Sequence, residues 1–93
     1  MQAANDNYST IHAMIHNRQA FEQEVRNLII DASFKRPFPN FIAFSVLRHY
    51  GMNDDMEAMK EAEAIYNKYS GWEGETNFTT MTMLMCNLIT RRM

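Results

Sequence analysis

The chain has 93 residues, of which 46% are hydrophobic and 22% charged, and its net charge is −2 at neutral pH. This length and composition predict a single globular domain covering residues 1–93, because two halves would be too small to bury separate cores. There is no uncharged apolar tract of about 18 residues, so we expect no membrane-spanning segment. The polar stretch 1–9 lacks the hydrophobic part of a secretion signal, and we therefore expect a cytoplasmic protein.

The charges are unevenly distributed along the chain. Residues 54–75 carry seven acidic residues against two lysines, whereas the last residues add the basic pair Arg91 and Arg92. Nucleic-acid-binding domains usually carry a basic stripe, and no long basic run occurs here. The pattern therefore disfavours a nucleic-acid-binding function.

The first predicted helix covers residues 10–33, after a frayed N-terminus of residues 1–8. Its apolar residues recur at helical steps: Ile11, Met14, Phe21, Val25, Leu28 and Ala32. A continuous helix would be roughly 36 Å long, which is long for so small a domain. A break near His16-Asn17, with Asn17 capping a second helix, is the alternative.

Two prolines mark a loop over residues 34–40, since each forces the residue before it out of helical geometry. Asn40 is then expected to cap the next helix. Residues 41–50 are apolar almost all round, which is typical of a buried central helix. Gly51 is expected to end this helix in a left-handed conformation.

A third helix begins at Asn53-Asp54-Asp55, where Asp54 and Glu57 form a variant of the capping box. The last stretch, residues 78–93, is ambiguous, because Thr and Met alternate over residues 80–83 as in a strand. Its apolar residues nevertheless fall at helical spacings, and we predict a helix. The sequence thus predicts an all-α, compact single-domain bundle of four helices, or five if the first is broken, with residues 41–50 at the centre.

No arrangement of residues in the sequence indicates catalysis. His12 and His16 share a helix face and could supply two ligands to a metal, but a third and fourth ligand would have to come from elsewhere, such as His49 or Glu22. Cys86 is expected in the middle of a helix among apolar residues, where a thiol is inert. We therefore expect no enzyme activity, no cofactor and no metal site.

The nine methionines are the most unusual feature of the composition. Six of them gather over residues 52–59 and 81–85. They either fill a core between two facing helices or form an adaptable, methionine-rich binding surface. The first interpretation is favoured, but the other apolar residues could supply a core by themselves, so the second interpretation stays open.

These observations predict a non-enzymatic interaction protein: a regulator, adaptor or inhibitor that docks on a protein partner, as phage and other mobile-element accessory proteins do. An exposed apolar patch on the first helix could also support a two-fold homodimer. The candidate partner-binding residues are Ile11, Met14, Ile15, Asp54, Asp55, Met56, Glu57, Met59 and Glu61. One alternative is nucleic-acid binding through a basic face of Lys35, Arg36, Arg48, Arg91 and Arg92. The other is a small metal protein or enzyme that uses His12 and His16.

Overall fold

The computed structural model describes residues 15–69 and 74–93, and these residues form a helical bundle without any strand. The helices are α2 (Arg18–Lys35), α3 (Pro39–His49), α4 (Met56–Tyr69) and α5 (Glu75–Arg92). The prediction of an all-α bundle is confirmed. Across residues 15–69 and 74–93, no helix has both the length and the apolar character needed to cross a membrane.

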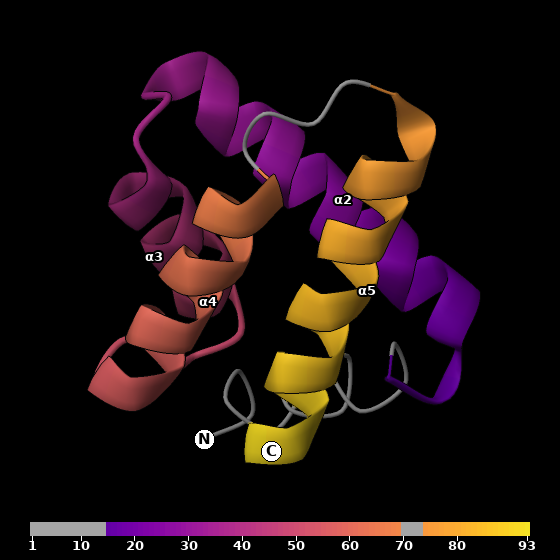
Figure 1. Ribbon diagram of the computed structural model, residues 1–93. Coiled ribbons are helices and arrows are strands. Elements are labelled where there is room, and N and C mark those ends of the chain that lie inside the picture. Colours follow the sequence, from indigo (N-terminus) through magenta and orange to yellow (C-terminus); the bar gives the residue numbers. More distant parts are fainter. Residues whose placement is uncertain (1–14, 70–73) are drawn as a thin grey trace.

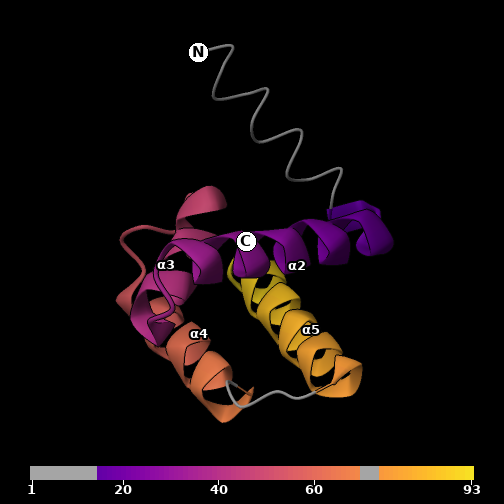
Figure 2. The same cartoon turned by 90° about the horizontal axis from the view of Figure 1, so that it is seen from above.

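The four helices pack in a ring. Helix α2 contacts α3 and α5, and α4 contacts the same two helices from the other side. Helices α4 and α5 run antiparallel, so the start of α4 lies near the end of α5 (Figure 1). Seen from above, α2 crosses α5 at a large angle (Figure 2). The Cα radius of gyration is 12.8 Å, close to the value of about 12 Å expected for a globule of this length.

Helix α5 contributes most to the core. Its buried residues are Phe78, Met81, Thr82, Met85, Cys86, Leu88 and Ile89. The residues predicted as a helix buried all round, 41–50, instead have two faces. Ile42 and Leu47 are fully buried, whereas Phe44 is only partly buried and Arg48 is exposed. The prediction of a central helix was wrong, because α3 packs mainly against two neighbours and leaves one face open.

The first predicted helix is broken at Asn17. Residues 15–16 are helical, Asn17 forms a bend, and α2 starts at the next residue. The Asn17 side chain accepts a hydrogen bond from the backbone N–H of Ala20 at 3.3 Å, which caps α2. The alternative with a break is therefore confirmed, and the continuous helix over residues 10–33 is wrong.

Two of the predicted helix caps lie at other residues than expected. Helix α3 starts with Pro39 and has no side-chain cap, and Asn40 lies inside the helix. Proline suits this first position because it has no N–H that needs a partner. At α4 the cap is Asp55 rather than Asp54, since the Asp55 Oδ1 accepts the N–H of Ala58 at 3.0 Å.

Gly51 ends α3 as predicted, with φ at +78°. The N–H of Gly51 donates to the Arg48 carbonyl at 3.0 Å, and that of Met52 donates to the Leu47 carbonyl at 2.9 Å. These two bonds form a Schellman motif, which closes the helix end and turns the chain sharply toward α4.

The ambiguous last segment is helical throughout. Its alternating threonines do not compete with the helix, because their hydroxyls bond to the backbone one turn earlier. The buried Thr82 hydroxyl donates to the Phe78 carbonyl at 2.9 Å, and Thr80 donates to Thr76 at 2.9 Å. Each hydroxyl is thereby satisfied inside the helix.

Candidate functional site

The predicted apolar patch on the first helix lies mostly outside the described residues. Nothing can be placed for Ile11 and Met14, which precede residue 15. Ile15 is partly buried and packs against the core. Of this patch, the described part therefore belongs to the packing of the bundle.

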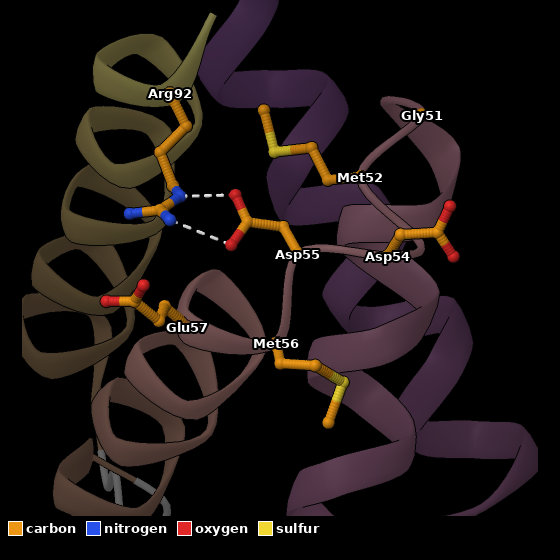
Figure 3. Close-up of a pocket in the computed structure, with 7 residues that line it drawn as sticks. All are labelled: Gly51, Met52, Asp54, Asp55, Met56, Glu57 and Arg92. Atoms are coloured by element: carbon orange, nitrogen blue, oxygen red, sulfur yellow. Dashed lines mark hydrogen bonds and ion pairs between the residues drawn. The ribbon is translucent and has the colours of Figure 1, made fainter.

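An open depression of about 570 Å³ lies where α3 turns into α4, beside the end of α5 (Figure 3). Three of the predicted partner-binding residues line it with exposed side chains, and we call them the acidic corner: Asp54, Met56 and Glu57. Met56 is 65% exposed. Asp54 and Glu57 form no ion pair with any residue in the described part of the chain.

The neighbouring acids are neutralised by the end of α5. Arg92 donates two hydrogen bonds to the Asp55 carboxylate, from Nε to Oδ2 at 2.5 Å and from Nη2 to Oδ1 at 2.8 Å. The bonds from Arg92, and then that from the Ala58 N–H, lower the pKa of Asp55. Arg91 forms an ion pair with Glu61 through a single hydrogen bond, from Nη2 to Oε2. Asp55 and Glu61 thus join α4 to α5 and are not free for a partner.

The methionines divide between core and surface. Met81 and Met85 are fully buried and Met52 nearly so. Met59 is partly buried and packs against the core. Among the methionines of residues 52–59 and 81–85, only Met56 in the acidic corner and Met83 on α5 are largely exposed. Met83 is 44% exposed. Most of these methionines therefore fill the core.

The five basic residues proposed as a nucleic-acid face do not form one patch. Arg91 and Arg92 are held by acids at the end of α5. Lys35 pairs with Asp31 at 3.2 Å at the end of α2, which lies at the opposite end of the bundle in Figure 1. The Arg48 guanidinium lies over the Phe44 ring, 5.8 Å from its centroid.

The last turn of α2 and its connection to α3 present two phenylalanines to the solvent. Phe34 is 84% exposed and Phe38 is 57% exposed. With the exposed cations between them, they form a surface that we call the aromatic edge: Phe34, Lys35, Arg36 and Phe38. Arg36 makes no ion pair with a residue in the described ranges. The loop predicted over residues 34–40 was too long, since Phe34 and Lys35 belong to α2 and only residues 36–38 connect it to α3. No docking surface was predicted in this stretch.

Backbone hydrogen bonds fix the conformation of this connection. The N–H of Arg36 donates to the Ala32 carbonyl at 3.0 Å, and the N–H of Phe38 donates to the Arg36 carbonyl at 2.8 Å across Pro37. The second bond makes a three-residue turn. A groove of about 270 Å³ between α2 and α3 adjoins the edge and shares Lys35 with it.

The residues considered for chemistry lie apart from both surfaces. His12 precedes the described residues, and His16 is exposed. Among residues 15–69 and 74–93, no three metal-binding side chains are grouped closely enough to hold an ion. Cys86 is fully buried, and burial raises its pKa to about 12. The thiol therefore stays protonated at neutral pH, where it is a poor nucleophile.

The candidate functional site consists of two surfaces, the aromatic edge before α3 and the acidic corner after it. Each combines exposed apolar atoms with charged groups, and the two carry opposite charges. In comparisons with known proteins, the chain matches no family model, no curated protein and no solved structure.

Proposed function

We propose that this chain is a non-enzymatic interaction protein that docks on another protein through the aromatic edge. The observation that carries the proposal is the exposure of two phenylalanines four residues apart in the chain, Phe34 at 84% and Phe38 at 57%. Isolated exposed apolar residues are common, but a contiguous apolar patch usually marks an interface. Full burial of one such side chain contributes roughly 1.5–3 kcal/mol.

The edge has two further properties of a docking surface. Its backbone is held by the bonds around Pro37, so little conformational entropy is lost when a partner binds. Aromatic residues and arginine are also enriched at protein interfaces, and Arg36 lies between the two phenylalanines in the chain. These properties favour a preformed protein-binding surface.

Charge magnitudes disfavour nucleic acid and membrane as the ligand. Arg36 is the one cation of the edge without an acidic neighbour paired to it among the described residues, since Lys35 pairs with Asp31. Each cation near an anionic membrane contributes about 1 kcal/mol, and stable anchoring needs more than one strong signal. Nucleic-acid affinity likewise grows with the number of neutralised phosphates, which would be small here.

Such a protein would act as a regulator, adaptor or inhibitor, because its effect would come from occupying a partner's surface. We place it in the cytoplasm, where its single thiol, Cys86, would stay reduced. The acidic corner is a second surface of the same kind and would favour a basic partner surface.

Affinity capture from the native cell tests the proposal. Tagged wild-type protein is compared with a variant carrying Phe34→Ser and Phe38→Ser, and with Met83→Ser as a matched exposed apolar control. We expect one or more proteins to be retained by the wild type and the control, and to be lost from the double variant. Equal retention by all three would show that the edge is not the docking surface.

A further inference from the structure

We infer that the aromatic edge binds the acidic corner of a second copy of this chain. The inference rests on the proposed function, because it names the partner of the same edge. The edge offers phenyl rings beside the cation Arg36. The corner offers carboxylates and the exposed thioether of Met56 around an open depression. Each surface therefore supplies the chemistry that the other requires.

The two surfaces lie at opposite ends of α3. The edge directly precedes Pro39, where α3 begins, and the corner follows Gly51, where the chain leaves it. Eleven helical residues separate them by roughly 16 Å. In Figure 1 the connection between α2 and α3 is at the top left and the start of α4 is at the lower left. One molecule therefore cannot place its own edge on its own corner.

Two copies with antiparallel α3 helices bring each edge onto the other's corner. This arrangement has two-fold symmetry, so the same contact forms twice and the assembly closes as a dimer. It also places the positive start of one α3 beside the negative end of the other, which adds to the attraction of the side-chain charges.

The charged side chains that remain unpaired at the two ends of α3 have opposite signs, as this contact requires. Arg36 has no ion-pair partner within residues 15–69 and 74–93, and the same is true of Asp54. In Figure 3 the side chains of Asp54 and Met56 point away from Arg92, and Arg92 is hydrogen-bonded to Asp55. The carboxylate of Asp54 is thus free to meet the guanidinium of a second copy.

The apolar parts are also matched. Methionine sulfur makes favourable contacts with aromatic rings, and Met52 and Met56 both line the depression. Its volume of about 570 Å³ leaves room for phenyl side chains from the second copy. The contact would cover the exposed apolar surface of Phe34, Phe38 and Met56 together.

Sedimentation equilibrium of charge-reversal variants tests the contact. At about 100 µM, where even weak dimers are populated, we expect the wild type to be dimeric. Arg36→Glu alone, or Asp54→Arg alone, should weaken dimerisation by about tenfold or more, because like charges then face each other. The double variant should regain it. Lys68→Glu is the control at an exposed cation on the far end of α4. Circular dichroism melts check that all variants fold.

The outcomes separate this inference from the proposed function. A monomeric wild type, or a double variant that stays monomeric, overturns the inference. If Phe34→Ser with Phe38→Ser still abolishes capture of another protein in that case, the proposed function stands. If the wild type is instead monomeric and binds vesicles of phosphatidylcholine and phosphatidylserine through the edge, the occupant is a lipid surface and both proposals fall.

Discussion

Tyr50 brings a phenol into the core, where its hydroxyl has no hydrogen-bond partner among the described residues. Its ring packs edge-on against Phe21, with centroids 5.5 Å apart, and phenylalanine would keep that contact. An unpaired buried polar group is unfavourable, so we predict that Tyr50→Phe raises the free energy of unfolding by about 1 kcal/mol. Urea denaturation at pH 7 measures it.

The same residue makes stability depend on alkaline pH. Burial is the main cause that raises the pKa of Tyr50 above its usual range, and it raises that of Cys86 to about 12. A group with a raised folded-state pKa contributes stability below its unfolded pKa and loses it as pH rises. Wild-type stability should therefore fall above about pH 9, and less steeply in Tyr50→Phe. Parallel pH profiles for the two proteins would contradict this.

Phe34 and Phe38 are predicted to contribute little to folding, because most of each side chain is exposed. Phe34→Ser and Phe38→Ser, made as separate variants, should each change the free energy of unfolding by less than about 0.5 kcal/mol. Phe21→Ala is the matched comparison, since Phe21 is fully buried and such a truncation costs about 3–5 kcal/mol. Chemical denaturation of the three variants decides whether the edge is a surface or part of the core.

At the scale of the helices, α3 should be asymmetric in its response to mutation. Leu47 is fully buried, so Leu47→Ala should destabilise the protein by about 2–5 kcal/mol. Phe44 is only partly buried, and truncating it should cost clearly less. A larger loss at Phe44 than at Leu47 would mean that the open face of α3 is covered in solution.

The junction of α4 and α5 depends on Asp55, which both caps α4 and pairs with Arg92. Asparagine can cap but cannot form the ion pair, so Asp55→Asn should be less destabilising than Asp55→Ala. The lowered pKa of Asp55 means that its stabilisation is present above about pH 4 and is lost as pH falls below it. The stability difference between wild type and Asp55→Asn should then shrink in acid, which thermal melts at pH 7 and pH 3 can show.

Local sequence signals predicted the helices well where one signal was clearly stronger than its alternatives. Gly51 ended α3 because a left-handed cap needs glycine, and helical spacing in residues 78–93 outweighed the alternation of Thr and Met. The errors came from competition between neighbours. Asn40 was a plausible cap, but the neighbouring Pro39 starts α3. Asp54 was also a plausible cap, but the neighbouring Asp55 caps α4.

The sequence could not predict which charged side chains remain unpaired once the helices pack together. Asp55 and Arg92 are far apart in the chain, and only the antiparallel packing of α4 and α5 brings them together. The same holds for Glu61 and Arg91. The predicted set of partner-binding acids was therefore too large, because it included the paired Asp55 and Glu61. The aromatic edge was missed because the sequence around Phe34 and Phe38 does not show whether a phenylalanine packs in the core or lies exposed.

Site-specific photo-crosslinking in the native cell tests whether the aromatic edge is a docking surface. A photoreactive phenylalanine analogue is placed at position 34, and at position 83 as an exposed control on α5. We predict a covalent protein adduct from position 34 and none from position 83, and an adduct of two copies of the chain if the edge meets the acidic corner. No adduct from position 34, or equal adducts from both positions, would show that the aromatic edge is not a docking surface.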